Sequence, residues 1–475
     1  RSRGLGDVYK RQGVYHSCAI LDNYSVKCWG YNAYGQLGYG NTTNIGHQAN
    51  DMWGDRHTTV DLGVNVTAVD ITAGYYHTCV ITNLDEVKCW GNNQYGQLGI
   101  GNTLQIGDNA GEMGDNLASV DLGYGRTAIK ITSSGHSTCA ILDSGLVKCW
   151  GYNQYGQLGI GNTNHIGDNS GEMGNNLAIS DLGVNITAIE IDAGWGNYCV
   201  IINNGSVKCW GYNAYGQLGA GNTSTLGDGS GEMGDKLEIV DLGVGRTAIS
   251  ITLGDLHACV ILDNEDLKCW GYNNAGQLGI GNNLQIGDNA GEMGDNLATP
   301  QLPSPYIKYI SAGYRHTCAI IFDDSVVCWG YNGNGLLGIE NNLPQIGDGD
   351  GEMGNNLELT DINLVPVDTD GDGWIDIWDR DDDNDGYIDV NDDLPLDVRD
   401  WIDSDGDGLG DNVDTDDDDP TVRIAEDDTI FTWSDSEEEA CGYMPMSSLS
   451  TPADYDGDGI CDKLDNDIDG NGWDN

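Results

Sequence analysis

Residues 77–99 read HTCVITNLDEVKCWGNNQYGQLG, and this wording returns along the chain at a nearly constant interval. Each copy is built around two cysteines ten positions apart, and Trp-Gly follows the second cysteine. Successive copies begin 59 to 61 residues apart. Such a period indicates one supersecondary unit that stacks on copies of itself. The cysteine pairs that mark the six copies are Cys18 with Cys28, Cys79 with Cys89, Cys139 with Cys149, Cys199 with Cys209, Cys259 with Cys269, and Cys318 with Cys328.

Each copy is expected to contain short β-strands and no long helix. Residues 127–132, 138–142 and 146–150 predict three strands, with a hairpin turn at 143–145. Residues 118–122 predict a fourth strand ahead of them. Four short antiparallel strands per repeat are typical of a β-propeller blade. One tryptophan recurs in every copy and is expected to pack as a wedge between blades: Trp29, Trp90, Trp150, Trp210, Trp270 and Trp329.

The repeat resembles the regulator of chromosome condensation (RCC1) repeat, as in His77-Thr-Cys-Val-Ile and Val87-Lys-Cys-Trp-Gly. The resemblance covers residues 13–365 and implies an all-β fold, a propeller with seven blades in that family. Because six units are visible, we expect a truncated ring that a missing N-terminal portion completes. Residues 1–12 (RSRGLGDVYKRQ) match no part of the repeat and resemble a non-native sequencing scar. We therefore expect the first unit to lack its leading strand.

The resemblance also implies three possible functions, and the sequence does not support them equally. The eukaryotic founder of the family is a nucleotide exchange factor for a small GTPase and also docks on chromatin. Exchange depends on a wedge inserted into one blade, whereas these six copies have nearly equal lengths. Chromatin docking needs a basic surface, whereas residues 1–365 carry a net charge of −22. Secreted prokaryotic relatives use the propeller as a binding or inhibitory platform, which is the interpretation that we favour.

The cysteine spacing predicts disulfides. Cysteines ten apart across a short turn fall on one face of two antiparallel strands, where a disulfide can join them. We expect such a bond in all six repeats and a seventh between Cys441 and Cys461. The alternative is reduced core cysteines in a cytosolic protein. Fourteen cysteines that can all pair, with no CxxC zinc spacing, favour an oxidising compartment and an extracellular or cell-surface location.

Two adjacent positions vary from copy to copy while the scaffold around them repeats. They precede a polar residue (His16, His77, Ser137, Asn197, His257 or His316) that is expected to form hydrogen bonds near a strand start and not to bind metal. The variable positions should cluster on one rim of the propeller, with the Tyr, Trp and Arg content of a binding surface. A freely drifting loop is the alternative. The candidate partner-binding residues are Tyr15, Tyr75, Tyr76, His136, Trp195, Leu256, Tyr314 and Arg315.

An acidic loop follows the Gly-Gln-Leu-Gly motif, as in residues 106–115 (IGDNAGEMGD). It recurs at 166, 226, 286 and 346 and diverges in the first copy at 47–51. These loops are expected to be solvated surface, with a cation-recruiting ring of carboxylates as the alternative. The sequence contains no Ser/His/Asp set, paired catalytic carboxylates or phosphate-binding loop, so an enzyme is not expected.

A composition change near residues 365–368 predicts a domain boundary. Residues 366–475 hold 38 acidic and four basic residues, a net charge of −34 out of −56 for the whole chain. Such a field disfavours nucleic acid and anionic lipid as partners. We divide this part into calcium repeats at 366–420, a linker at 421–453, and a further, truncated calcium repeat at 454–475.

Carboxylates in the acidic part recur in the register of a calcium loop. Asp368, Asp370, Asp372 and Asp376 occupy positions 1, 3, 5 and 9, glycine occupies position 6, and Asp379 occupies position 12. The spacing resembles thrombospondin type 3 repeats, and a disordered acidic spacer is the alternative. The remaining expected ligands are Asp381, Asp383, Asp385, Asp389, Asp392, Asp403, Asp405, Asp407, Asp411, Asp414, Asp454, Asp456, Asp458, Asp462, Asp465, Asp467, Asp469 and Asn471.

The residues and the resemblances together predict a secreted or cell-surface binding protein. A disulfide-stapled propeller would bind an unknown protein or glycan partner, and a calcium-stabilised stalk would carry it. No stretch approaches eighteen consecutive apolar residues, so no transmembrane segment is expected in the visible chain. The alternatives are an RCC1-type nucleotide exchange or regulatory protein and an extracellular enzyme with a pocket at the propeller centre.

Overall fold

The computed structural model describes residues 10–21, 23–46, 59–304, 306–322, 324–339, 343–349 and 351–360, with seven further positions between 384 and 402. The chain divides into two compact units, residues 8–363 and residues 1–7 with 364–475. The fold below is that of the first unit. The expected calcium ligands and the Cys441–Cys461 disulfide lie outside the described residues.

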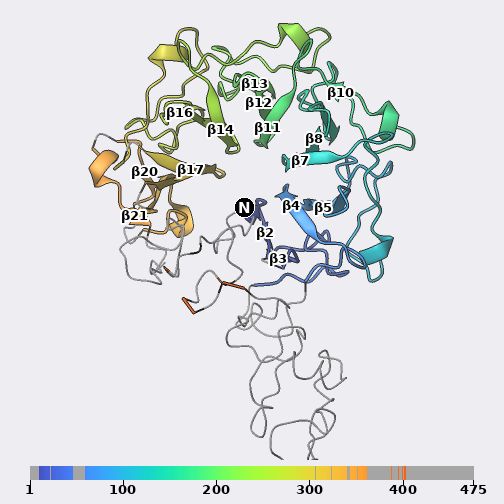
Figure 1. Ribbon diagram of the computed structural model, residues 1–475. Coiled ribbons are helices and arrows are strands. Elements are labelled where there is room, and N and C mark those ends of the chain that lie inside the picture. The colour runs from blue at the N-terminus through green and yellow to red at the C-terminus, as the bar shows by residue number, and fades with distance from the viewer. Residues whose placement is uncertain are drawn as a thin grey trace, which may run out of the picture. The chain divides into compact units, whose positions relative to one another are not determined.

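The first unit is an all-β propeller of six antiparallel blades around a central axis (Figure 1). The inner strands of five blades are β4 (Ala68–Ala73), β7 (Ala128–Ser133), β11 (Ala188–Ala193), β14 (Ala248–Leu253) and β17 (Ile307–Ala312). The middle strands are β2 (His16–Ile20), β5 (His77–Thr82), β8 (Ser137–Leu142), β12 (Asn197–Ile202), β15 (His257–Leu262) and β18 (His316–Ile321). The outer strands are β3 (Val26–Gly30), β6 (Val87–Gly91), β9 (Val147–Gly151), β13 (Val207–Gly211), β16 (Leu267–Gly271) and β19 (Val326–Tyr331).

The fourth strand, at the outer edge of the blade, is shorter than expected or absent from the described residues. In the third blade it is the two-residue strand β10 (Ile179–Ser180), which pairs with β9. In the sixth blade two such strands, β20 (Gln345–Ile346) and β21 (Leu359–Thr360), pair with β19. The fourth strand expected at 118–122 is reduced to a single bridge between Lys88 and Ser119. The chain turns away at once, because the Asp121 backbone carbonyl accepts a hydrogen bond from Gly174 N–H in the next acidic loop.

The first blade has an inner strand, contrary to our expectation. Strand β1 (Lys10–Gln12) pairs antiparallel with β2, although these residues match no part of the repeat. The free backbone groups of β2 can accept any extended segment, because ladder hydrogen bonds use only main-chain atoms. The pairing therefore does not require the repeat sequence.

Disulfides join the middle and outer strands of every blade, as the cysteine spacing predicted. In the second blade Cys79 lies directly opposite Cys89, and their Cα atoms are 4.1 Å apart. Because no cysteine of the described residues is free, all six expected bonds are confirmed there. In the chain-entropy picture, each short loop contributes about 2–3 kcal/mol of stability. The bonds of the other five blades join Cys18 to Cys28, Cys139 to Cys149, Cys199 to Cys209, Cys259 to Cys269, and Cys318 to Cys328.

The hydrophobic core lies between blades. One cluster joins Ile20 and Val26 of the first blade to Ile71, Val80 and Trp90 of the second, and similar clusters follow around the ring. Five of the repeated tryptophans are fully buried there, as predicted for wedges. Each of the five also donates its indole N–H to a glutamine carbonyl of the preceding blade, as Trp150 does to Gln97 at 3.0 Å. Each of these tryptophans therefore joins two neighbouring blades by a hydrogen bond as well as by packing.

The polar residue at the start of the middle strand forms a second fastener between blades, which we call the latch. His77 Nε2 lies 3.0 Å from the Thr138 hydroxyl of the next blade, and His16 and His257 form the same contact with Thr78 and Thr317. Burial lowers the pKa of His77 to about 3, so the imidazole is neutral. This arrangement agrees with the expected hydrogen-bonding role.

The latch has an alternative form in the middle of the array. Where Ser137 replaces histidine, Tyr198 replaces the threonine, and their hydroxyl oxygens are 2.9 Å apart. A shorter side chain on one blade is thus matched by a longer one on the next. At the following interface Asn197 faces Ala258, which has no hydroxyl, and both amide atoms of Asn197 are buried without a hydrogen-bond partner in the described residues.

Candidate functional site

The variable residues lie in the loops that join inner to middle strands. In the second blade this loop is residues 74–76, between β4 and β5. Because inner, middle and outer strands alternate in direction, the segment after the outer strand lies at the same end of the blade. In three copies that segment has the full motif Gly-Tyr-Asn-x-Tyr-Gly, and the other copies keep one of its two tyrosines. Two sets of aromatic residues therefore meet at one end of the propeller.

These two sets form a continuous aromatic surface, which we call the aromatic rim. In it, Tyr15 stacks on Tyr76 with ring centroids 5.2 Å apart, and Tyr76 contacts His136 at 6.1 Å. The contacts continue from blade to blade, and the guanidinium of Arg315 ends the series. The members of the aromatic rim are Tyr15, Tyr31, Tyr34, Tyr75, Tyr76, Tyr95, His136, Tyr152, Tyr155, His165, Trp195, Tyr212, Tyr215, Tyr272, Tyr314 and Arg315.

Arg315 is held against two tyrosines of the rim. Its guanidinium carbon lies 5.5 Å from the Tyr272 ring centroid and 5.0 Å from that of Tyr314. Both distances fall within the range of a cation–π interaction. The rim thus already binds one cationic side chain of its own.

The structure places seven of the eight candidate binding residues in the aromatic rim. Leu256 is the exception: it is half-buried, and it contributes its backbone carbonyl, which accepts the N–H of Tyr272 at 2.9 Å. Nine of the sixteen rim residues were not predicted from sequence, because the candidates were chosen by variation between copies, whereas Tyr31, Tyr152 and Tyr212 repeat. The available signal was a pair of tyrosines three residues apart ahead of the Gly-Gln-Leu-Gly motif, as in residues 152–155.

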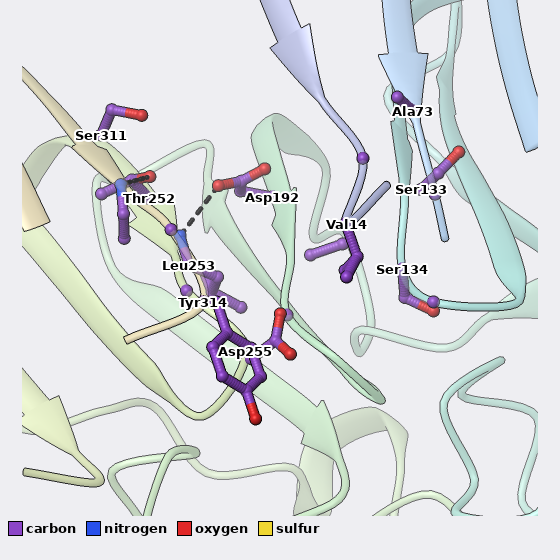
Figure 2. Close-up of a pocket in the computed structure, with 18 of the residues that line it drawn as sticks. Val14, Ala73, Ser133, Ser134, Asp192, Thr252, Leu253, Asp255, Ser311 and Tyr314 are labelled. Carbon is purple, nitrogen blue, oxygen red and sulfur yellow. Dashed lines mark hydrogen bonds between the residues drawn. The ribbon is translucent and has the colours of Figure 1, made fainter. Parts of the chain in front are cut away.

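A cavity of about 760 Å³ lies where the inner strands end. Its lining includes Val14, Ser134, Asp192, Asp255 and Tyr314, which come from five different blades (Figure 2). The dashed line in Figure 2 is the hydrogen bond from Leu253 N–H to the Asp192 carboxylate, 2.8 Å long. This bond satisfies a backbone group at the free edge of β14. Part of the polar lining therefore fastens neighbouring blades together.

One contact spans the ring across this cavity. The Tyr75 hydroxyl donates to Asp255 Oδ2 at 2.9 Å, although the two residues are 180 positions apart. Burial raises the pKa of Asp255 to about 6, while the Tyr75 hydrogen bond and the Arg315 charge oppose this increase. Burial and the Asp255 charge both raise the pKa of Tyr75, which stays protonated. Asp255 is thus a non-repeating carboxyl group with a raised pKa whose hydrogen-bond partner is the Tyr75 hydroxyl.

Each acidic loop forms a clasp, by which we mean a close backbone contact with the preceding blade. Glu112 accepts backbone N–H bonds from Gly107 and Asn109 at 2.9 and 3.0 Å, which holds the loop in a compact turn. The loop packs on the preceding blade so closely that a Cβ on Gly35 would lie 2.3 Å from Asp108 N. The same Glu contacts and close approaches recur in the later copies. These loops are therefore surface turns, exposed at residues 109–111, that also pack on the preceding blade.

Two kinds of feature are absent from the described part of the chain. There, no group of three or more His, Cys, Asp or Glu side chains is placed to hold a metal ion. None of the helices in that part is long and apolar enough to span a membrane.

Comparison with protein families identifies the class of the repeat. The model described as the regulator of chromosome condensation (RCC1) repeat matches residues 12–36, 68–97, 128–157, 188–217, 248–277 and 307–336, and a second RCC1 repeat model matches 269–320. Each of the six matches includes the middle and outer strands of one blade. The chain is therefore an RCC1-like repeat protein with a propeller fold.

Two known proteins are similar to the chain in sequence. The ultraviolet-B receptor UVR8 of Arabidopsis thaliana is 27% identical over 377 residues, which cover 76% of this chain and 74% of the receptor. The human E3 ubiquitin-protein ligase HERC2 is 26% identical over 270 residues, 57% of this chain but 5% of the ligase.

Two solved structures share the fold at low sequence identity. Human WBSCR16 has a TM-score of 0.56 at 17% identity, covering 76% of this chain and 84% of that one. Yeast RCC1 (Prp20), solved with Kap60 bound, has a TM-score of 0.54 at 18% identity, covering 75% of each chain. These similarities show that the chain has a propeller fold, and they do not identify a binding partner.

Proposed function

We propose that this chain is a partner-binding protein that acts outside the cell or on its surface and carries no catalytic activity of its own. The observation that carries the proposal is the aromatic rim: a contiguous surface of tyrosine, tryptophan and arginine at one end of a rigid ring. These residue types dominate the energetics of protein interfaces because they bury a large area and lose little conformational entropy. The rest of each repeat is used to fasten one blade to the next.

The oxidising environment is supported by the cysteines. All six blades contain a disulfide in the described residues, and such bonds persist in secreted and surface proteins. The expected calcium loops belong to the same proposal, since extracellular calcium modules bind at about 10⁻⁴ to 10⁻³ M, the range found outside cells. Calcium would stiffen residues 366–420 and 454–475 into a stalk.

The binding role is tested with carbohydrate and peptide arrays. Wild-type protein is compared with Trp195→Ala, which removes a central ring of the rim, and with Tyr124→Ala as a matched control. Tyr124 is 93% exposed and lies in the turn that precedes β7, whereas the rim lies at the other end of the inner strands. We expect at least one ligand class to lose binding to Trp195→Ala and to keep it with Tyr124→Ala. Identical array profiles for all three proteins would remove the rim from consideration as a binding surface.

A regulatory role of the RCC1 type is the second candidate, because both UVR8 and yeast RCC1 are among the similar proteins. It is tested by release of fluorescent GDP from a small GTPase in the presence of the chain. Acceleration of release, together with a requirement for reduced cysteines, would favour this role. On the proposal made above, the release rate stays at its spontaneous value.

A further inference from the structure

The border of the aromatic rim is acidic, and this sets the charge of what the rim can bind. Four of the acidic loops contact the turn directly after a rim tyrosine, as Asp228 does at Gly156, the residue that follows Tyr155. A Cβ on Gly156 would lie 2.2 Å from Asp228 N. The same approach places Asp168 beside Gly96 and Asp288 beside Gly216, next to Tyr95 and Tyr215. The backbone of an acidic residue therefore lies beside the turn that follows each of these tyrosines.

These carboxylates repel one another within each loop. Burial, and then the neighbouring Glu112, raise the pKa of Asp108, and Asp108 Oδ1 is buried without a hydrogen-bond partner in the described residues. Burial and the facing Glu232 have the same effect on the pKa of Asp228. A cation placed beside such a pair relieves this repulsion, so its binding is more favourable than at an isolated carboxylate.

The rings themselves favour cations. Tyr155, Trp195 and Tyr212 contact one another with centroids 4.9 to 5.4 Å apart, and the backbone of Asp228 packs against Gly156, the residue after Tyr155. Aromatic faces carry negative quadrupole potential and attract guanidinium and ammonium groups, Trp most strongly. Arg315 demonstrates the contact within the protein, because it lies over two rim tyrosines. The Tyr76 phenol is neutral, since burial and the Tyr15 hydrogen bond raise the pKa of Tyr76 to about 12.

We propose that the aromatic rim binds a basic polypeptide segment, whose Arg and Lys side chains stack on the rings and pair with the carboxylates that border them. The proposal rests on the binding role given above and adds the chemistry of the partner. Its strongest subsite is the group of Tyr155, Trp195 and Tyr212 with Asp228. Residues 1–365 carry a net charge of −22, so the overall field also steers a basic partner toward the propeller.

The test measures peptide binding to the full chain. The probe is a flexible Gly/Ser peptide that carries several arginines, and the matched probe carries glutamates at the same positions. We expect the arginine peptide to bind and the glutamate peptide not to bind. The acidic C-terminal region attracts a basic peptide as well, so the informative quantity is the difference between variants that share this region.

Four variants locate the binding. Trp195→Ala should raise the Kd of the arginine peptide by about tenfold, the size of a partly desolvated cation–π contact. Asp228→Asn should raise it less and should flatten its salt dependence, because an exposed charge pair is screened. Tyr124→Ala should leave the Kd unchanged. Tyr31→Ser, at a ring that is 38% exposed, gives a second test and should also raise the Kd, and melting curves show that each variant is folded.

Footprinting by hydroxyl radicals and mass spectrometry gives an independent result: the peptide should protect Tyr31 and Trp195 and leave Tyr124 reactive. The proposal is overturned if Trp195→Ala and Tyr124→Ala bind the arginine peptide alike, or if the glutamate peptide binds as well. If a neutral glycan then binds in a Trp195-dependent way, the rim stands as a binding surface and only the basic partner is wrong. If no ligand depends on the rim, both proposals fail.

Discussion

Replacing the His77–Thr138 latch by the Ser–Tyr latch of the next interface is predicted to make that interface insensitive to acid. The change is the double substitution His77→Ser with Thr138→Tyr, which copies the Ser137–Tyr198 contact. The natural latch contains a buried imidazole, and the copied latch contains two hydroxyl groups that do not titrate in acid. The two proteins should therefore be similar at neutral pH and differ as the pH falls.

The magnitude follows from the pKa of His77. Burial lowers it from its usual 6.5 to about 3 in the folded chain. Between pH 6.5 and pH 3 His77 is protonated in the unfolded chain and neutral in the folded chain. The free energy of unfolding is therefore highest above pH 6.5 and decreases as the pH falls toward 3. At pH 5 the loss is about 2 kcal/mol for this one histidine, at 1.36 kcal/mol per pH unit. At pH 7 it is close to zero.

The assay is denaturant unfolding at pH 7, 6 and 5 with the disulfides intact. All other titrating groups are common to both proteins, so the difference in slope isolates His77. Thr138→Val is the control for a broken latch, since it should cost about 1–3 kcal/mol of stability at pH 7 by leaving His77 without its partner. Equal pH slopes for wild type and the double variant would refute the assignment of His77 as a buried neutral latch.

Three further predictions follow from other contacts. Ala258→Thr should stabilise the protein by about 1 kcal/mol in thermal melts, because the new hydroxyl gives the buried Asn197 amide a partner; a lower melting temperature would contradict this. Gly96→Ala should cost about 2–5 kcal/mol, since φ is +77° and the new Cβ would meet Asp168 N at 2.3 Å, whereas Gly171→Ala, at φ +85° with nothing within 4 Å, should cost only about 1–2 kcal/mol; equal costs would show that the clasp is not tight. Calcium at about 10⁻³ M should change the circular dichroism of the full chain reversibly, with chelation restoring the original spectrum, and an unchanged spectrum would eliminate the calcium loops.

The parts of the fold that repeat could be predicted from sequence. The cysteine pairs fixed the register of the middle and outer strands, because side chains ten apart across a turn face one another. The buried tryptophans could be inferred as wedges, since an identical large side chain in every copy serves the scaffold. The fourth strand at 118–122 was wrong in length, because the carbonyl of Asp121 bonds the next acidic loop and not the blade edge.

The candidate site could be predicted only in part. Variation between copies located Tyr15, Tyr76 and Trp195 correctly in one rim, but the same criterion discarded the repeated tyrosines that complete it. The contact between Tyr75 and Asp255 crosses the ring between residues 180 positions apart, and periodicity carries no information about which blades face each other. The close packing of the acidic loops on the preceding blade depends on backbone contacts at glycine, which side-chain patterns do not reveal.

The oxidation state of the cysteines is the claim on which the proposed compartment and the stability of each blade both depend. It is tested most directly by counting free thiols in denatured protein purified from its native source without reductant. The account predicts that the twelve cysteines of the six blades do not react until reductant is added. Twelve reactive thiols before reduction would contradict it and would favour an intracellular regulator.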